Sequence, residues 1–376
     1  MTRKEINEIK GLFTIEECNI KKLKGCYVDG DKNKITQIDE MFYNLPEEEQ
    51  HKYLEIFRKC LTGTPGRNLI DMTFSESAVS SGGARELLCS LRETELSDDN
   101  FVDKLYDKII DTYDTVGNYL ILLINQTYDV PGITEDNIEM DDASEEIYNY
   151  ILCCICPVKL SKPGLSFDEI QNNFHNLERS WVVDMPEVGF LFPAFNLRSE
   201  DMDNILLYSK DTDEFQDAFI DAVLDCHIPL PATAQKETFK SIVEETVGSN
   251  CDYEVIKTIN DNISEVVAQK KDLPDNGSLT KKEVKTIFER SGLDQESLNR
   301  FDAAFDKLLP KEDEKEPVLM ATNIAPSRKF EVKTPDVVVK INSDKTDLVE
   351  TREIDGNNYL LIRIDEGLVV NGISVG

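Results

Sequence analysis

The side chains most suited to binding a metal ion lie in DLPDNGSLTKKE, residues 272–283. Asp272, Asn276 and Glu283 occupy positions 1, 5 and 12 of a calcium-binding loop. Pro274 stands at position 3, where such a loop needs another oxygen ligand. The sequence therefore offers an incomplete calcium site.

A turn and a helix start are the competing interpretation of the same segment. Asn276 and Gly277 favour a tight turn, because both residue types tolerate a positive φ. Thr280 and Glu283 have the spacing of a capping box, in which each side chain accepts a hydrogen bond from the other residue's backbone N–H. We expect the turn and capping box and keep calcium as the alternative.

Three cysteines in EIYNYILCCICPV, residues 146–158, are a second candidate for a metal site. Strand alternation places Cys153 on one face and Cys154 and Cys156 on the other, and no second Cys or His pair has zinc spacing. We expect buried core cysteines. The three histidines lie far apart in the sequence: His51, His175 and His227. We predict no catalytic constellation and no cofactor.

The chain is strongly acidic, with 41 basic against 73 acidic residues and a net charge of −32. Residues 67–317 hold 23 against 52, a net of −29, whereas the two ends are almost neutral. Such a field repels nucleic acid and anionic membranes and attracts basic protein surfaces, besides keeping the chain soluble. A basic protein is therefore one predicted partner.

Basic residues collect in the near-neutral first 66 residues, which hold 11 Lys and Arg against 12 Asp and Glu. Any contact with duplex DNA would use this segment, because phosphate binding requires Lys and Arg. The candidate DNA-binding residues are Arg3, Lys4, Lys10, Lys21, Lys22, Lys24, Lys32 and Lys34.

The N-terminus, MTRKEINEIKGLF, lacks the apolar segment of a signal peptide, and no run has the length of a membrane span. Nine cysteines in a chain of 376 residues do not have the spacing of a disulfide framework. We expect a cytoplasmic protein with reduced thiols and no membrane partner.

Gly117–Pro131, GNYLILLINQTYDVP, predicts the central strand of the fold. Its apolar run, Tyr119–Ile124, is too short for a stable helix and is bounded by turn residues, which is typical of a strand buried on both faces. Residues 146–158 and 180–195 have the same character. Upstream, residues 19–28 and 34–42 predict a hairpin around DGDKN, with positive φ at Gly30 and Asn33.

These elements predict an α+β protein with several regions. Residues 1–200 form a mixed α/β domain with a central, mostly antiparallel sheet. Residues 201–309 have helical periodicity throughout. PKEDEKEP, residues 310–317, is a charged linker bounded by prolines. Residues 318–376 form a small β module of short strands, with Asp355 and Gly356 in a hairpin turn.

Several blocks carry a resemblance over nearly the whole chain: CYVDGDKNK, FRKCLTGTPG, DKIIDTYDTVGNYLILLI, ILCCICPVKLSKPGLS, GFLFPAF and FEVKTPDVVVKIN. With them the chain resembles an uncharacterised family of Gram-positive anaerobes, a domain of unknown function. That resemblance implies no activity.

Residues 219–247 and 328–364 carry a more distant resemblance, to the 37-kilodalton nucleoid-associated proteins. The matching positions in the first segment are Phe219, Leu224, Cys226, Gln235, Phe239 and Val243. This resemblance implies a cytoplasmic, non-catalytic protein of the bacterial chromosome, with an α/β first domain and a helical middle.

The resulting expectation is a non-enzymatic interaction protein of nucleoid-associated type that binds DNA or a DNA-associated protein. One alternative is an acidic docking protein that binds a basic protein without nucleic acid. A second is a metal-dependent enzyme using Asp272, Asn276 and Glu283, or Asp336 and Glu350. The oligomeric state does not follow from the sequence.

Overall fold

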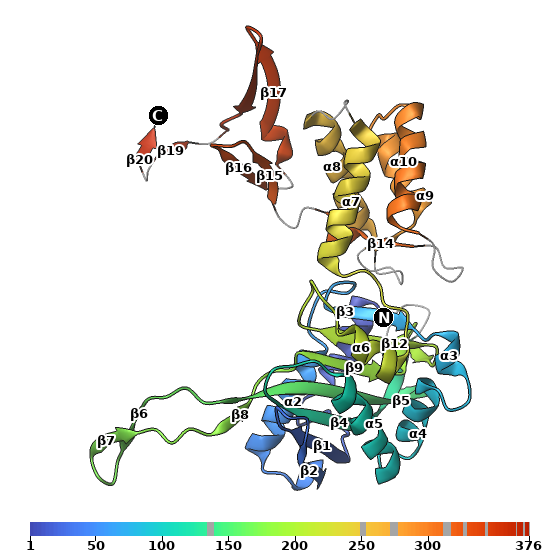
Figure 1. Ribbon diagram of the computed structural model, residues 1–376, viewed down its shortest axis with the longest axis vertical. Helices are drawn as coiled ribbons and strands as arrows, with labels where there is room; N and C mark the ends of the chain where they lie inside the picture. Colours follow the sequence, from blue (N-terminus) through green and yellow to red (C-terminus); the bar gives the residue numbers. More distant parts are fainter. Residues whose placement is uncertain are drawn as a thin grey trace. The chain divides into compact units, whose positions relative to one another are not determined.

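The computed structural model divides into two compact units, residues 1–231 and 232–376 (Figure 1). The mixture of helices and antiparallel strands confirms the expected α+β class. The described residues are 1–133, 139–248, 253–270, 277–310, 317–325, 329–342, 345–365, 367–370 and 373–375. Six residues of the expected linker, 311–316, lie outside this set.

The first unit is built on one antiparallel sheet with the strand order β2-β1-β4-β5-β9-β12-β3. A short strand, β8, pairs with the end of β5. Their bounds are β1 (Lys22–Val28), β2 (Lys34–Met41), β3 (Leu69–Thr73), β4 (Asn118–Ile133), β5 (Glu139–Leu160), β8 (Trp181–Val183), β9 (Val188–Phe192) and β12 (Asn204–Ser209).

The predicted central strand is confirmed as the first half of β4. Its side chains alternate between two hydrophobic cores, so that Ile121 enters the first core and Leu122 the second, and neither is exposed to solvent. The same alternation in β5 sends Cys153 to the first core and Cys154 and Cys156 to the second, as predicted. The sheet is therefore buried on both faces.

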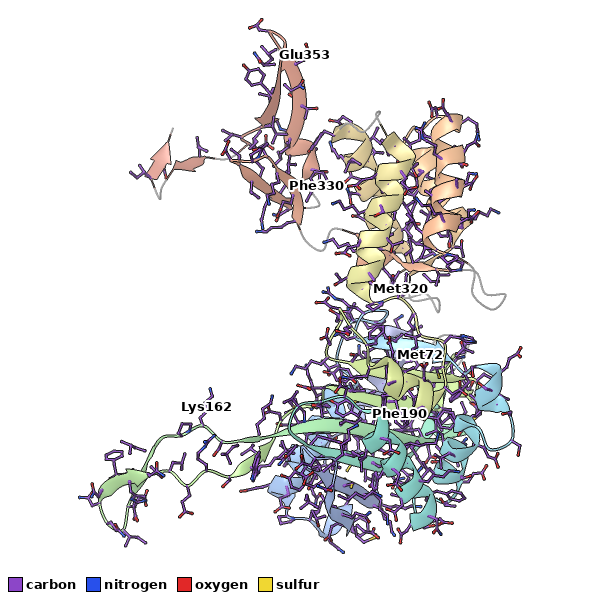
Figure 2. All side chains as sticks on the ribbon, viewed as in Figure 1. Met72, Lys162, Phe190, Met320, Phe330 and Glu353 are labelled. Carbon is purple, nitrogen blue, oxygen red and sulfur yellow. The ribbon has the colours of Figure 1, made fainter. Side chains whose placement is uncertain are left out.

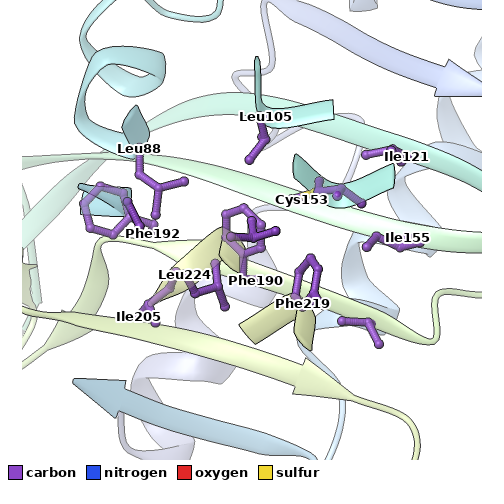
Figure 3. Close-up of a cluster of buried hydrophobic side chains, with 14 of the residues drawn as sticks. Leu88, Leu105, Ile121, Cys153, Ile155, Phe190, Phe192, Ile205, Phe219 and Leu224 are labelled. Carbon is purple, nitrogen blue, oxygen red and sulfur yellow. The ribbon is translucent and has the colours of Figure 1, made fainter. Parts of the chain in front are cut away.

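Helices cover each face of this sheet. The first core is closed by α4 (Ala84–Glu93) and α5 (Asp99–Thr112), whose Leu88 and Leu105 point toward Phe190 of β9 (Figure 3). The second core is closed by α1 (Arg3–Gly11) and α2 (Glu47–Cys60). Each of these four helices buries apolar side chains at helical spacing. A 3-10 turn, η1 (Phe42–Asn44), precedes α2.

The hairpin β1–β2 forms as predicted, but its turn uses other backbone angles. The residue with positive φ is Lys32, at 65°, so the assignment to Gly30 and Asn33 was wrong. Asp29 explains the difference, because its Oδ1 accepts hydrogen bonds from the N–H groups of Asp31 and Asn33, both at 2.9 Å. The Asp29 side chain therefore shapes the turn.

The end of the first unit is less helical than its periodicity suggests. A single helix was expected over TDEFQDAFIDAVLDC, but the chain forms α6 (Asp217–Phe219) and a π-helical turn, η2 (Ile220–Leu224). It ends at Asp225, whose φ of 50° is left-handed. The Asp225 carboxylate accepts hydrogen bonds from Ser75, the N-cap of α3 (Glu76–Val79), and from Ser77 within that helix. These bonds fix the helix end against β3 and α3.

Beyond the sheet, the chain forms a projecting hairpin between β5 and β8 (Figure 1). Its outer part is β6 (Leu165–Asp168) paired with β7 (Asn173–Asn176). We call residues 160–183 the arm. A smaller hairpin of β10 (Ala194–Asn196) and β11 (Ser199–Asp201) follows β9.

The second unit begins with a helical bundle around its own hydrophobic core, which includes Phe239, Phe288 and Phe301. Two short strands pair within this bundle, so residues 319–325 belong to it and not to the β module. The elements are α7 (Ala232–Val247), α8 (Tyr253–Lys270), β13 (Ser278–Leu279), α9 (Lys281–Arg290), α10 (Gln295–Leu308), β14 (Leu319–Met320) and α11 (Ala321–Ile324).

Three antiparallel hairpins complete the chain, as the predicted β module requires. They are β15 (Lys329–Lys333) with β16 (Val338–Asn342), β17 (Val349–Ile354) with β18 (Asn357–Ile362), and β19 (Leu368–Val370) with β20 (Ile373–Val375), with a 3-10 turn η4 (Thr346–Leu348) before β17. The turn between β17 and β18 contains Asp355 and Gly356, both at positive φ, as expected. None of the helices in the described part of the chain has both the length and the apolar character needed to cross a lipid bilayer.

Candidate functional site

A cavity in the first unit has a volume of about 770 Å³ and lies at one end of the sheet. It forms where β9 begins, β12 ends and α5 ends, because the order of the strands places β9 beside β12. We call it the acidic pocket. Its lining consists of Tyr113, Asp114, Glu187, Val188, Ser209, Lys210, Asp211, Thr212, Asp213, Glu214, Phe215, Gln216, Asp217 and Ala218.

Hydrogen bonds hold the pocket loop in place. Ser209 Oγ donates to the carbonyl oxygen of Asp211 at 2.7 Å, and Asp211 Oδ1 accepts from the N–H of Asp213 at 2.8 Å. Across the pocket, Gln216 Nε2 donates to the Asp114 carbonyl oxygen at 2.9 Å, and Gln216 Oε1 accepts from the Asp114 N–H at 3.2 Å. The loop is therefore tied to the end of α5 by a paired amide contact.

Negative charge dominates this pocket. Six carboxylates line it against one lysine: Asp114, Glu187, Asp211, Asp213, Glu214 and Asp217 against Lys210. The Nζ of Lys210 lies 3.3 Å from Glu187 Oε1, so the lysine is already engaged by one of the six. A ligand that carries positive charge fits this pocket, because neighbouring carboxylates of like charge repel one another until a cation lies between them.

The predicted DNA-binding lysines are not gathered into an open basic surface. Lys24 is the clearest case, since its side chain is 5% exposed and its Nζ lies 2.7 Å from both Asp39 and Asp99. Burial by itself lowers the pKa of Lys24, but the hydrogen bonds to the two carboxylates outweigh it and raise the pKa above the ordinary value. The hydrogen bond from Lys24 lowers the pKa of Asp39.

The neighbouring lysines also contact acidic partners. Lys21 lies 2.9 Å from Glu95, Lys22 lies 3.6 Å from Asp39, and Lys34 lies 2.7 Å from Asp107. Lys32 Nζ instead donates to the carbonyl oxygen of Asp111 at 3.0 Å. On α1, Arg3 and Lys4 are exposed and Lys10 is half-buried. The structure thus places the eight candidates on α1, on β1 and β2 and in the segments beside these strands, and it pairs four of them with carboxylates.

The family model described as "Domain of unknown function (DUF4317)" matches residues 1–373. The chain belongs to this family. Among curated proteins, no relative matches the chain. The near full-length resemblance is therefore confirmed, and the family brings no recorded activity with it.

Only part of the candidate calcium-binding loop, residues 272–283, belongs to the residues that the structure describes. Asp272 and Asn276 lie outside the described residues. The capping box is confirmed, with Thr280 and Glu283 each accepting from the other's backbone N–H. Burial raises the pKa of Glu283, but hydrogen bonds from Lys270, at 2.7 Å, and Thr280 outweigh it and hold the pKa below its ordinary value.

The three strand cysteines lie in the two cores, and burial raises the pKa of each thiol: Cys153, Cys154 and Cys156. Across the described ranges, no group of three or more His, Cys, Asp or Glu residues has the arrangement of a metal site. Of the histidines, His51 lies on the exposed face of α2, His175 lies at the outer part of the arm, and His227 follows η2. The described structure places these three in separate regions.

Sequence reasoning missed the acidic pocket, because its acidic residues come from three segments that lie up to about 100 residues apart in the sequence. The signal that was present is DTDEFQD, residues 211–217, where four of seven residues are acidic. Periodicity assigned that segment to a helix face, on which the acids would be scattered into solvent. The structure instead holds it as a loop against Asp114 and Glu187.

Proposed function

We propose that this chain is a non-enzymatic interaction protein whose acidic pocket binds a basic segment of a protein partner. The observation that carries the proposal is the lining of the pocket, which includes six acidic residues and one lysine that Glu187 already engages. A lysine or arginine side chain entering the pocket would be held by several carboxylates at once, and Arg can contact two carboxylate oxygens in parallel.

The charge of the whole first unit supports the same class of partner. Residues 1–231 hold 21 Lys and Arg against 45 Asp and Glu, a net charge of −24. A field of this size attracts a basic protein from a distance and accelerates association at low ionic strength. It acts against direct binding of duplex DNA, whose phosphates carry the same sign.

Ion pairs within the chain also argue for a protein partner and against direct binding of DNA. Lys21, Lys22, Lys24 and Lys34 contact acidic side chains, so binding DNA phosphate through them would cost those ion pairs. Asp211, in the pocket, uses Oδ1 to shape its loop by accepting two backbone hydrogen bonds. Because this carboxylate oxygen is already used to hold the loop in position, it supports a binding function over acid–base catalysis.

Association with the bacterial chromosome is the second candidate. The resemblance of residues 219–247 and 328–364 to nucleoid-associated proteins motivates it, and the exposed Arg3 and Lys4 on α1 are the residues available for phosphate. A basic protein that itself binds DNA would satisfy both hypotheses, since it would bridge the acidic pocket and the chromosome. We place this function in the cytoplasm, supported by the described cysteines, none of which forms a disulfide bond.

A capture experiment with the full chain separates the two candidates. The immobilised chain is incubated with bacterial lysate with and without nuclease, and the bound fraction is then washed with rising salt. A basic protein that stays bound after nuclease and leaves with salt is expected. A fraction that disappears whenever nuclease is present, together with retention of purified duplex DNA at low salt, would favour direct DNA binding.

A further inference from the structure

The arm, residues 160–183, exposes large apolar side chains along its whole length (Figure 2). At its outer end, Ile170 is 97% exposed, Leu165 is 74% exposed and Phe174 is 62% exposed. Nearer the sheet, Trp181 is 57% exposed and Val182 is 49% exposed. Contiguous apolar surface of this extent is uncommon on a monomer and marks an interaction site.

The outer part of the arm is a regular two-stranded ladder, which is joined to the sheet by residues 161–164 and 177–180. Phe167 pairs with Phe174 in the β6–β7 ladder, and their ring centroids lie 5.1 Å apart. Closer to the sheet, the Ser161 N–H donates to the Ser180 carbonyl oxygen at 2.8 Å. A two-stranded ribbon without a covering layer is marginally stable in water. The arm therefore requires a partner surface to cover its apolar side chains.

One face of the arm continues the second core of the first unit. Val158 lies in that core, and it stands opposite Val183 in the β5–β8 ladder. Two residues farther out, Leu160 stands opposite Trp181, so both side chains lie on the same face as Val158. Inside the unit, α1 and α2 cover this face, whereas Leu160 and Trp181 lie beyond them with 37% and 57% exposure.

We propose that the arm packs against the arm of a second copy of this chain and so forms a homodimer. The apolar side chains of the arm expose roughly 1,000 Å² per copy, summed over both faces of the ribbon, and a standard interface buries about 800 Å² of polar and apolar surface per partner. Two copies related by a two-fold axis present the same surface to each other, and two apolar ribbons can pack face to face as sheets do.

Charge gives the arm no preference for the basic partner of the proposed function. The arm holds two basic and three acidic residues, whereas the remainder of the first unit carries a net charge of −23. Because the arm is nearly neutral and projects from the acidic body, two copies can join their arms while the bodies stay apart (Figure 1). This dimer is independent of what the acidic pocket binds.

Trp181 gives a direct readout, since it is the chain's sole tryptophan. The full chain is measured from about 1 to 100 µM by light scattering after gel filtration, and the tryptophan emission is recorded over the same range. We expect the mass to rise to twice 42.7 kDa with concentration, with a shift of the emission to shorter wavelength as Trp181 becomes covered.

The variant pair Phe167→Ser with Phe174→Ser should weaken dimerisation at least about tenfold. Its matched control is Tyr43→Ser with Val116→Ser, which removes two exposed apolar side chains outside the arm. The control should dimerise like the wild type. Circular dichroism at 1 µM should be the same for all three proteins, because the changed side chains are exposed.

A chain that stays monomeric up to 100 µM would overturn the proposal. A monomer whose Trp181 emission shifts only when phosphatidylcholine vesicles are added would overturn it in favour of a membrane surface. A dimer of undiminished affinity in the arm variant would also overturn it, because the interface would then lie elsewhere.

Discussion

Lys24 Nζ lies 2.7 Å from Asp99 Oδ1, which joins the sheet to α5 through a nearly buried ammonium group. Asp39, opposite Lys24 in the β1–β2 ladder, lies at the same distance on its other side. A lysine with two carboxylate partners cannot also serve as a free phosphate contact. The relationship turns a residue expected at a DNA surface into a structural link between β1, β2 and α5.

Lys24→Met should therefore destabilise the first unit. The change keeps most of the apolar stem but removes two charge-assisted hydrogen bonds, so the free energy of unfolding should fall by about 1–2 kcal/mol. Urea denaturation followed by circular dichroism measures it. Lys21→Met is the matched control, because the Lys21–Glu95 pair is exposed and its loss should cost less than about 0.5 kcal/mol. Equal losses in the two variants would contradict the structural role of Lys24.

The contribution of Lys24 should also depend on pH with a defined sign. The pKa of Asp39 is lowered in the folded state, so its contribution is present above the unfolded pKa and is lost as pH falls through the folded pKa. The difference in stability between wild type and Lys24→Met should therefore shrink as pH falls below about 3.9. The raised pKa of Lys24 predicts a second loss at alkaline pH, as pH rises through that pKa. A difference independent of pH would show that the two groups are not coupled.

Gly189 should be intolerant of any side chain. A Cβ at this position in β9 would lie 2.4 Å from the Cys153 carbonyl oxygen and 2.4 Å from Cys60 Sγ. We expect Gly189→Ala to lower the free energy of unfolding by about 2–3 kcal/mol or more, because the surrounding core has to shift. Gly11→Ala, at the end of α1, is the control, since nothing lies within 4 Å of its Cβ. Thermal unfolding compares the two, and a normal melting temperature for Gly189→Ala would argue against the described packing of β5 on β9.

Glu283→Gln separates the capping box from the calcium alternative. Glutamine keeps an acceptor for the Thr280 N–H, so the helical bundle should lose only about 0.5–1 kcal/mol, mainly from the ion pair with Lys270. Glu283→Ala should cost more, because the N–H of Thr280 then loses its partner. Calcium at millimolar concentration should leave the melting temperature of the wild type unchanged. A rise with calcium that Glu283→Gln abolishes would restore the metal site.

The parts of the fold that were predictable are those set by local patterns. Six apolar residues between turn signals define the central strand, and strand alternation separates Cys153 from Cys154. The capping box of Thr280 and Glu283 is likewise a signal within four residues. In each case the physical cause lies within one turn or one strand, so the sequence displays it directly.

The other parts depend on residues that meet only in the folded chain. Lys24 was expected to be available for binding DNA phosphate, because neither Asp39 nor Asp99 is near it in the sequence. No element was predicted for residues 160–174, because LSKPGLSFDEIQNNF mixes proline, glycine and polar residues with isolated apolar ones. The pocket needs Glu187 beside Lys210, which follows from the pairing of β9 with β12. The periodicity of a short segment does not show with which distant strand it pairs.

The most direct test of the proposed function is the affinity of the acidic pocket for a basic peptide. Fluorescence anisotropy of a labelled decalysine peptide is measured with the full chain, with the triple variant Asp114→Asn, Asp211→Asn and Asp217→Asn, and with a control of equal charge. The control triple variant changes exposed acids away from the pocket: Glu40→Gln, Glu48→Gln and Glu55→Gln. Asparagine at position 211 keeps the acceptor oxygen that shapes the loop.

We predict that the pocket variant binds the peptide at least about tenfold more weakly than the wild type, a loss of about 1.4 kcal/mol, and that the control stays within about threefold. Affinity should fall with salt for all three proteins. Equal weakening in the pocket variant and in the control would contradict a defined site, because attraction by net charge alone does not depend on which three carboxylates are removed.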